Sequence, residues 1–210
     1  KNFRETVGRE LLSFFDIDKL MRGVERRRVS CFSCTVGCKH YFCAKEGEFA
    51  GLDLQLGCAL APSAAVAKCG VAGWLPTLKL AEMCNRLGMD YIAIGALAAM
   101  AIELYEKKIV TMNDTGGLTL GWDAGTLHRL VEDIAYRRGI GDVLANGFIE
   151  ASRQIGCGAE DYAIHFKGIS AGDPRLGLST TTFSTLTNVT GHPSHGTAMW
   201  FGVTREKLHQ

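Results

Sequence analysis

Three closely spaced cysteines near the start of the chain constrain its fold more than any other feature. Cys31, Cys34 and Cys38 form a C-x2-C-x3-C run that is followed at once by Lys39 and His40. A tight turn brings thiolates at this spacing close together, and soft thiolate ligands favour an iron–sulfur cluster or zinc. Zinc sites more often use two separated C-x2-C pairs, and this chain has no second pair. We therefore expect three ligands of an iron–sulfur cluster whose fourth ligand is distant, and keep zinc and unligated thiols as alternatives.

The composition agrees with metal or redox chemistry. The chain has 210 residues and 8 cysteines, too few for a disulfide scaffold and more than an ordinary enzyme needs, so we expect a reducing, cytoplasmic setting. A net charge of +1 gives no indication of a nucleic-acid partner. The first residues include no methionine and no apolar signal core, so we interpret the chain as a fragment or an internal domain.

The apolar residues are mostly spaced as in helices. Residues 91–100 are strongly apolar but too few to span a membrane, and Glu103 and Glu106 follow, so we predict a buried helix there. Leu127, Leu130, Val131 and Ile134 form the stripe of an amphipathic helix. No run shows the convincing period-2 alternation of a strand. The sequence therefore predicts a mainly α fold with long functional loops.

The boundaries of these helices follow from their capping residues. We expect Gly88 and Gly139 to end helices and Asp90 to cap the next one. The predicted helices are residues 3–28 with a break near 16–18, 76–88, 90–105, 126–138 and 142–156; residues 31–57 are predicted to be loop, and residues 59–72 either a tight loop or a close-packed helix.

A basic run, Arg26-Arg27-Arg28, precedes the cysteines. Our main interpretation is a solvated face. The alternative is a docking patch for an acidic electron-transfer partner, because such partners associate through complementary charge.

Taken in order, four stretches resemble the aldehyde ferredoxin oxidoreductase family of tungsten- or molybdenum-pterin enzymes. The first is the cysteine triplet. The second is residues 84–95, C-N-R-L-G-M-D-Y-I-A-I-G, which is similar to the family's C-D/N-x-x-G-L-D-x-I-S-x-G. The family often has Asp where this chain has Asn85, and Leu where this chain has Met89. The third is residues 134–147, I-A-Y-R-R-G-I-G-D-V-L-A-N-G, similar to the family's I-A-x-R-x-G-x-G-D-x-L-A-x-G. The fourth is Phe166-Lys167-Gly168 with Asp173-Pro174-Arg175.

The resemblance implies an enzyme that oxidises a small aldehyde to a carboxylate and passes electrons through a [4Fe-4S] cluster to ferredoxin or another electron carrier. In that family the dithiolenes of two pterins hold the metal, and a β domain that binds pterin precedes the part seen here. Residues 1–165 would be the second, helical domain with the cluster loop, and residues 166–210 the start of a third. The chain alone would then be inactive. A homodimer is a further expectation, with neither nucleic acid nor membrane as a partner.

The same resemblance implies the fourth cluster ligand and the pterin contacts. The family's fourth cysteine lies in a D-x-x-G-L-C motif that has no match before Gln210, so either it is missing or one of Cys43, Cys58, Cys69, Cys84 and Cys157 replaces it. Asn85, Gly88, Met89 and Asp90 would lie at a pterin, where a carboxylate accepts N–H groups and glycine permits close approach. The alternative for Gly88 and Asp90 is a role as helix caps only. Asp173 and Arg175 would pair or cap a turn beside the pterin.

The resemblance also implies proton-handling residues. Glu48, ten residues after Cys38, resembles the family's active-site glutamate and would act as a general base, with Glu46 as the rival. His192 and His195 fall where the family has an active-site histidine, and we favour His195 because a glycine follows it. A zinc site formed by both histidines and Cys58 is a lesser alternative.

Three other functions are kept open. A tungsten-dependent aromatic acyl-CoA reductase shares these motifs and runs a reduction, with Cys58 as a further metal ligand. A non-catalytic iron–sulfur electron-transfer module accounts for the cysteines but not for the pterin-like segment. A structural domain stapled by zinc is the third.

Overall fold

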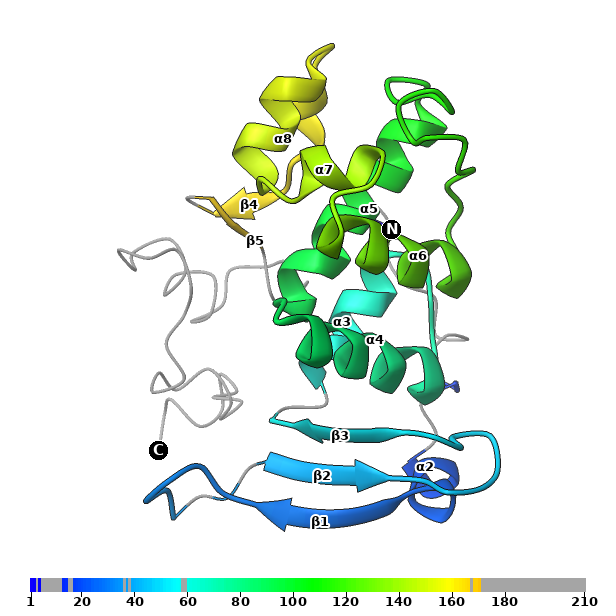
Figure 1. The fold of residues 1–210 in the computed structure, drawn as a ribbon, viewed down its shortest axis with the longest axis vertical. Coiled ribbons are helices and arrows are strands. Elements are labelled where there is room, and N and C mark those ends of the chain that lie inside the picture. Colours follow the sequence, from blue (N-terminus) through cyan, green and yellow to red (C-terminus); the bar gives the residue numbers. More distant parts are fainter. Residues whose placement is uncertain are drawn as a thin grey trace, which may run out of the picture.

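The computed structural model describes residues 1–2, 4, 13–14, 17–35, 37, 39–57, 60–166 and 168–170, and it shows a helical body above a three-stranded sheet (Figure 1). The fold class predicted from the sequence, mainly α, is confirmed. The elements in chain order are α2 (Ile17–Gly23), β1 (Glu25–Val29), β2 (Lys39–Cys43), β3 (Asp53–Leu56), α3 (Leu60–Lys68), α4 (Trp74–Leu87), α5 (Tyr91–Glu106), α6 (Ala124–Ala135), α7 (Ile140–Leu144), α8 (Phe148–Ile155), a 3-10 helix η1 (Ala159–Tyr162), β4 (His165–Phe166) and β5 (Ile169–Ser170).

The three-stranded sheet was not predicted. It is antiparallel in the order β1-β2-β3, with Glu25 opposite Cys43, Val29 opposite Lys39, and Cys43 opposite Asp53. The expected helix over residues 3–28 was wrong at its end, because residues 25–29 form β1, and the expected loop over residues 31–57 contains β2 and β3. Apolar alternation is hard to see here, because β1 is an edge strand with three exposed arginines and β3 has four residues.

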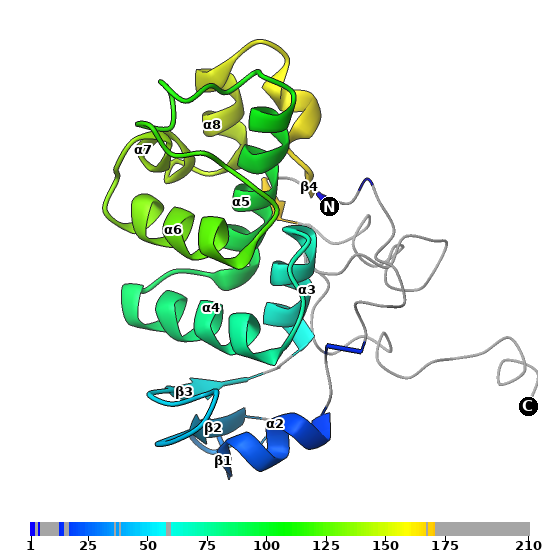
Figure 2. The same ribbon diagram turned by 90° about the vertical axis from the view of Figure 1, so that its right-hand side faces the viewer.

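One face of this sheet packs against helices. Phe42 on β2 and Leu54 and Leu56 on β3 are buried together with side chains from the flanking helices: Leu20, Trp74, Leu78 and Ala81. Figure 2 shows α2 and α4 lying against the sheet. The sheet is therefore fixed to the helical body mainly through one face of α4.

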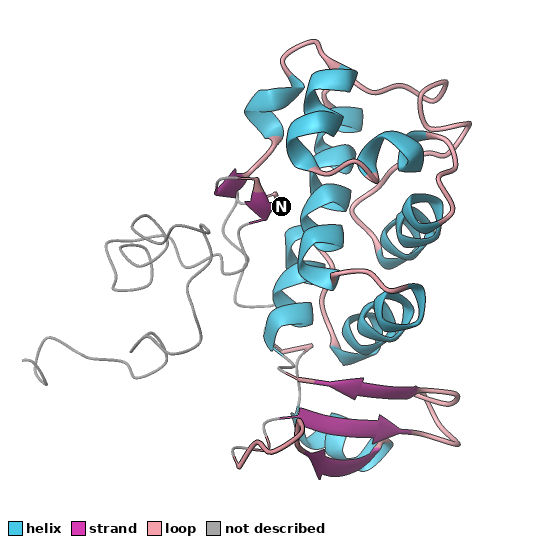
Figure 3. Ribbon diagram, turned by 60° about the vertical axis from the view of Figure 1, so that its left-hand side comes forward, coloured by secondary structure: helices cyan, strands magenta, loops and turns pink. Residues whose placement is uncertain are grey.

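The helical body is built around α5. Eleven consecutive residues of α5, 94–104, are buried, and four of them are alanines. Small side chains allow α3 to pack closely against α5, with Ala65 buried between them, which settles residues 59–72 as a helix rather than a loop. The predicted stripe on α6 is confirmed, because Leu127, Leu130, Val131 and Ile134 are all buried. Figure 3 shows these helices stacked above the strands.

Two of the predicted helix ends were correct and one was wrong. Gly88 ends α4 in the left-handed conformation, and Asp90 caps α5 by accepting the Ile92 N–H at 2.7 Å. Gly139 does not end α6, which stops at Ala135; instead Gly139 precedes α7.

The single helix expected over residues 142–156 is in fact α7 and α8, divided at Gly147. Gly141 in α7 lies against α6 so closely that a Cβ there would stand 2.2 Å from the Asp133 carbonyl. Only glycine therefore permits this contact between α6 and α7.

Asn2 and Arg4 contact residues of the helical body that are far away in the sequence. The Asn2 side chain donates to the buried carboxylate of Glu103 on α5 and to the Tyr162 carbonyl, while Arg4 forms an ion pair with Glu103 at 2.8 Å. The Asn2 backbone N–H donates to Lys68 at the end of α3. This N-terminal clasp, residues 1–4, gives a buried carboxylate the partners it needs.

Two further expectations from the sequence concern the domain boundary at residue 165 and membrane-spanning helices. The β4–β5 hairpin crosses the expected domain boundary at residue 165, and that boundary stays a prediction. In the described part of the chain no single helix is long and apolar enough to cross a membrane; α4 and α5 meet the length and hydropathy only as a pair bent by 111°.

Candidate functional site

The first two cysteines of the triplet lie in a turn at one end of the sheet, between β1 and β2. The Cys34 N–H donates to the Cys31 carbonyl at 3.1 Å, and Ser33 between them adopts a left-handed φ of 55°. Cys31 is exposed and Cys34 is half-buried. Both thiols are therefore on one tight turn, as the spacing predicts, and Cys38 lies outside the described residues.

An arginine stabilises the remainder of this cysteine turn, which comprises residues 30–35 and 37 among those described. Arg28 on β1 donates from Nε to the Gly37 carbonyl at 2.7 Å. Gly37 has a φ of 56°, and a Cβ there would stand 2.9 Å from Ser30 Oγ, so the turn requires glycine at this position. Arg28 was expected on a solvated or docking face, and no local sequence signal indicates this bracing role.

The segment expected at a pterin contacts the middle of the same sheet. The Asn85 side chain donates from Nδ2 to the carbonyl of Gln55 at 2.9 Å. Gln55 is opposite Tyr41, and the neighbouring pair, His40 with Leu56, continues to the Arg28–His40 pair beside the cysteine turn. The structure therefore attaches the end of α4 to the sheet that carries the cysteine turn, midway between the two ends of β2.

Gly88 and Asp90 have the capping roles that were the alternative to a cofactor contact. Gly88 donates to the Cys84 and Asn85 carbonyls, and one carboxylate oxygen of Asp90 accepts the Ile92 N–H. Both residues are also exposed, and nothing lies within 4 Å of a Cβ built on Gly88. Met89 between them is half-buried against the helical core. Gly88 and Asp90 therefore cap helices and also border open space, so a flat ring system can bind at this surface.

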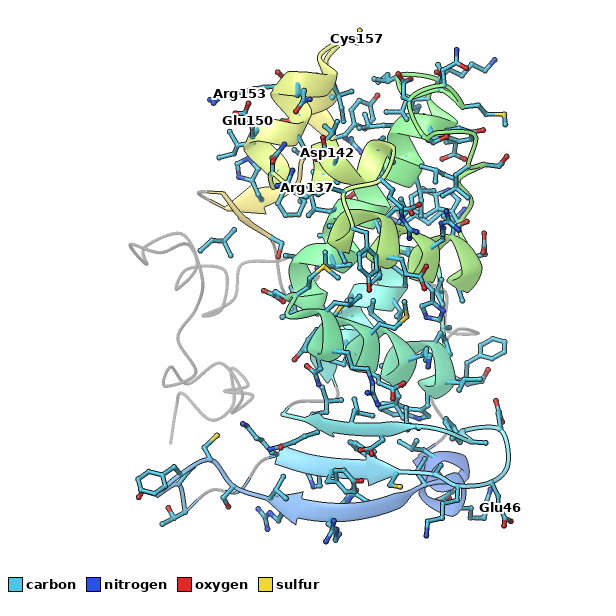
Figure 4. The ribbon with its side chains drawn as sticks, viewed as in Figure 1. Glu46, Arg137, Asp142, Glu150, Arg153 and Cys157 are labelled. Carbon is cyan, nitrogen blue, oxygen red and sulfur yellow. The ribbon has the colours of Figure 1, made fainter. Side chains whose placement is uncertain are left out.

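Glu46 and Glu48 lie at the opposite end of the sheet. They are exposed residues of the connection from β2 to β3, whereas the cysteine turn connects β1 to β2 (Figure 4). A five-residue antiparallel strand separates the two ends by about 14 Å. Glu46 lines a hollow of about 560 Å³ with Arg22 and Cys43, and Glu48 does not line it. The structure thus does not bring either glutamate together with the cysteine turn.

The far end of the sheet also has its own polar cluster. The Tyr41 hydroxyl donates to Asp53 and Cys43, and these hydrogen bonds raise the pKa of Tyr41 to about 12. Tyr41 therefore remains protonated at physiological pH and stabilises the sheet surface rather than transferring a proton.

The described cysteines make poor substitutes for a fourth cluster ligand. Cys69 and Cys84 are fully buried in the helical core, and burial raises the pKa of each thiol to about 12, which disfavours the thiolate that a metal needs. Cys43 ends β2 at the far end of the sheet, and Cys157 lies beyond α8, at the other end of the molecule (Figure 4). Cys58 lies outside the described residues.

The remaining expected site residues also lie outside the described residues. They are His192, His195, Asp173 and Arg175, and their roles stay predictions. Across the described ranges there is no group of three or more His, Cys, Asp or Glu side chains placed to hold a metal ion. The two thiols of the cysteine turn fit a cluster in ligand chemistry and spacing, and further ligands must come from elsewhere in the protein.

Comparison with known proteins identifies the family of the chain. The model of the family described as aldehyde ferredoxin oxidoreductase, domains 2 and 3, matches residues 1–207. The chain belongs to this family. Within it, the tungsten-containing aldehyde ferredoxin oxidoreductase of Pyrococcus abyssi is 28% identical over 71% of the chain and 24% of its own length. The aliphatic sulfonate oxidoreductase WOR-like subunit of Pyrococcus furiosus is 36% identical over 44% of the chain and 16% of its own length.

A solved structure extends the likeness to the fold. The active-site complex BamBC of benzoyl coenzyme A reductase, in complex with 1,5-dienoyl-CoA, superposes with a TM-score of 0.73 at 26% identity, over 91% of this chain and 29% of that one. The chain spans about a quarter of the length of the aldehyde oxidoreductase it matches. It therefore corresponds to one part of these larger enzymes.

Proposed function

We propose that this chain is part of an oxidoreductase that oxidises an aldehyde to a carboxylic acid at a tungsten or molybdenum bis-pterin centre and passes the electrons through a [4Fe-4S] cluster to ferredoxin. One observation supports this most directly. In a chain of this family, the Asn85 side chain is hydrogen-bonded to β3 of the same sheet whose β1–β2 connection carries the cysteines. A cluster and a pterin must lie close together if electrons are to pass between them.

The described residues have roles in this chemistry that follow from their surroundings. Cys31 and Cys34 would hold the cluster, with Cys38 as third ligand, and Arg28 would keep the turn in shape through Gly37. Asn85 and Asp90 would contact the pterin edge, and Gly88 would leave room for it. When bound, the two cofactors supply the two-electron oxidation, in which aldehyde and water give the acid, two protons and two electrons.

The proton-handling residues stay part of the proposal. Glu48, or its rival Glu46, would act as a general base, and His192 or His195 would hold the substrate oxygen. Because both glutamates lie at the sheet end opposite the cysteine turn, the bound substrate would have to lie toward that end for either to act on it. Glu48→Gln is expected to lower kcat by on the order of 10²-fold with metal content intact, and Glu46→Gln to leave it unchanged. Equal rates in both variants would remove Glu48 from the mechanism.

The cluster assignment has a direct test in the complete protein that contains these residues. Purified anaerobically, it is expected to contain iron, acid-labile sulfide and tungsten or molybdenum. Cys34→Ser should abolish the EPR signal of the reduced cluster, because a hydroxyl is a poor ligand for iron in such clusters. Cys157→Ser is the matched control, since that cysteine is exposed and far from the turn. An unchanged signal in Cys34→Ser, or zinc in place of iron, would contradict the assignment.

A second candidate is an aromatic acyl-CoA reductase, favoured by the likeness to the benzoyl coenzyme A reductase complex over 91% of the chain. The two enzymes differ in the direction of the reaction. Aldehyde-dependent reduction of a viologen dye would support the first, and dye-dependent reduction of benzoyl-CoA the second. A protein with cluster but neither activity nor tungsten or molybdenum would instead be an electron-transfer module.

A further inference from the structure

One cation of β1 is built into the cysteine turn. The hydrogen bond from Arg28 Nε to the Gly37 carbonyl is 2.7 Å long, and Gly37 directly precedes Cys38 in the chain. A hydrogen bond with a charged donor is shorter and roughly twice as strong as a neutral one. Arg28 therefore attaches a positive charge to the part of the turn that leads into the third cysteine.

The strand register explains why Arg28 makes this contact and its neighbour does not. Arg28 stands opposite His40, one position before the pairing of β1 with β2 ends at the cysteine turn. Arg27 stands opposite Tyr41 and lies over its ring at 5.1 Å. Because successive residues of a strand point to opposite faces, the two arginines lie on opposite faces of the sheet. The contact with the turn thus belongs to the position of Arg28 and not to the basic run as a whole.

The turn is closely packed around this hydrogen bond. A Cβ built on Gly37 would stand 2.9 Å from Ser30 Oγ and 3.5 Å from Arg28 Nε. Gly37 also has a φ of 56°, a conformation that residues with a side chain rarely adopt. The Arg28 Nε therefore lies against the backbone of the turn, at a place that the glycine keeps open.

The accepting carbonyl is chemically connected to the third cysteine. The Gly37 carbonyl and the Cys38 nitrogen belong to one peptide group, whose atoms share electrons by resonance. A cation bound at the oxygen withdraws electron density from that nitrogen and so makes its N–H a stronger donor. The net charge around an iron–sulfur cluster and the hydrogen bonds to its sulfurs both set its reduction potential.

The sequence around the turn has no anion to offset this charge. Residues 29–43, which run from the end of β1 to the end of β2, contain neither Asp nor Glu. The local surroundings of the cysteines are therefore cationic, and Arg28 is the cation that the structure shows in contact with the turn.

We propose that Arg28 is a positioning residue of the cysteine turn whose charge also raises the reduction potential of the cluster held there. This inference rests on the proposed function, because it needs a cluster bound by Cys31, Cys34 and Cys38. Reduction adds one electron from the oxidised substrate, and hence one negative charge, to the cluster and breaks no bond. A guanidinium held at the turn stabilises that added charge and so favours the reduced state.

A purely structural role for Arg28 makes a different prediction. If the hydrogen bond only holds the turn in shape, its loss would lower the cluster content, but the clusters that form would keep the reduction potential of the parent protein. Arg28→Gln keeps an N–H donor without the charge, whereas Arg28→Lys keeps the charge. The two variants therefore separate the effect of charge from that of bracing.

The test uses the complete protein, purified anaerobically and reconstituted with iron and sulfide where a variant has lost cluster. Iron and acid-labile sulfide are measured, and the reduction potential is obtained from a redox titration followed by EPR at low and high salt. Arg27→Gln is the matched control, because it removes the same charge from the adjacent residue on the other face of the sheet.

We expect Arg28→Gln to lower the ratio of reduced to oxidised cluster about threefold at a given applied potential, which is about 28 mV for a one-electron couple at 59 mV per tenfold change. The difference should shrink at high salt, because Arg28 is exposed and its charge is screened. Arg28→Lys and Arg27→Gln should stay close to the parent protein. An unchanged potential in Arg28→Gln, or an equal decrease in Arg27→Gln, would overturn the role of Arg28.

The titration separates this inference from the proposed function. If the parent protein holds a cluster and reduces a viologen dye with an aldehyde, but Arg28→Gln keeps the parental potential, the role of Arg28 alone is wrong. If the parent protein holds a cluster but oxidises no aldehyde, the proposed function fails, and the potential of Arg28→Gln still decides the role of Arg28. A parent protein without iron would overturn both.

Discussion

The helical body and the sheet beneath it are stabilised in different ways. In the body, α5 is buried along eleven consecutive residues and packs through alanine and glycine, so that backbones approach closely. The sheet buries only one face, and its connections, which carry the cysteines and the candidate glutamates, are exposed. Close packing thus fills the interior of the helical body, whereas the exposed connections of the sheet have room for cofactors and partners.

One helix belongs to both regions. Leu78 and Ala81 of α4 face the sheet, whereas Leu80 and Cys84 belong to the core of the body. Glu82 on the same helix is 3% exposed and accepts hydrogen bonds from Lys79, Arg86 and the backbone N–H of Asp53 in β3. Damage to the body, to this junction and to the site should therefore have effects of decreasing size.

The largest loss of stability is expected from Gly141→Ala. A Cβ there would overlap the Asp133 carbonyl at 2.2 Å, and both atoms are held by helices that cannot easily separate. We expect a loss of about 3 kcal/mol, measured by chemical denaturation followed by circular dichroism. The control is Gly57→Ala, because nothing lies within 4 Å of a Cβ at Gly57. Equal stability of the two variants would show that α6 and α7 are not packed as described.

A smaller and pH-dependent loss is expected from Glu82→Gln. Burial opposes ionisation of Glu82, but the hydrogen bonds from Lys79, Arg86 and the Asp53 N–H outweigh it and hold the pKa of Glu82 below its ordinary value of 4.5. A carboxylate with a lowered pKa stabilises the fold fully above the unfolded-state value and loses this contribution as the pH falls through the folded-state value. We expect about 2 kcal/mol at pH 7.

The measurement for Glu82 is the free energy of unfolding of the parent and the variant from pH 7 to pH 3. The difference between them should shrink below about pH 4.5. Glu132→Gln is the control, because the Glu132 carboxylate is half-exposed and pairs with Arg138 at 3.5 Å. A difference that stays constant down to pH 3 would mean that the ionised carboxylate does not link α4 to the sheet.

The smallest effect on stability is expected at Asp90, where capping and a pterin contact can be separated. Asp90→Ala should cost about 1 kcal/mol, whereas Asp90→Ser keeps an oxygen that accepts the Ile92 N–H and should cost much less. If the carboxylate also contacts a pterin, both variants should have a lower pterin content. Full pterin content in both would leave Asp90 as a cap alone.

The helices were predictable because their signals are local. The stripe of α6, the left-handed Gly88 and the Asp90 cap each follow from residues within one or two turns. The strands were missed because their signals are not. β1 presents three arginines to solvent, and its conformation is set by pairing with β2, which is 18 residues away for the Glu25–Cys43 pair. Local sequence signals alone had predicted residues 25–28 as the end of a helix.

The candidate site was predictable in its residues but not in its arrangement. The cysteine spacing correctly predicted a tight turn, and the resemblance correctly identified the family. The attachment of the 85–90 segment to the sheet depends on Asn85 reaching β3, and the separation of Glu48 from the cysteine turn depends on which strand end each connection joins. Both are consequences of pairing over long sequence distances, which a single sequence does not reveal.

The N-terminal clasp has a consequence for how the protein folds during synthesis. Asn2 and Arg4 are synthesised well before their partners Glu103 and Tyr162, which come about 100 and 160 residues later. Until Glu103 and Tyr162 leave the ribosome, the side chains of Asn2 and Arg4 lack these native partners. Loop closure over such distances is slow because it costs chain entropy before any contact repays it. The helical body should thus complete its packing late, only when Asn2 and Arg4 meet two residues that are synthesised long afterwards.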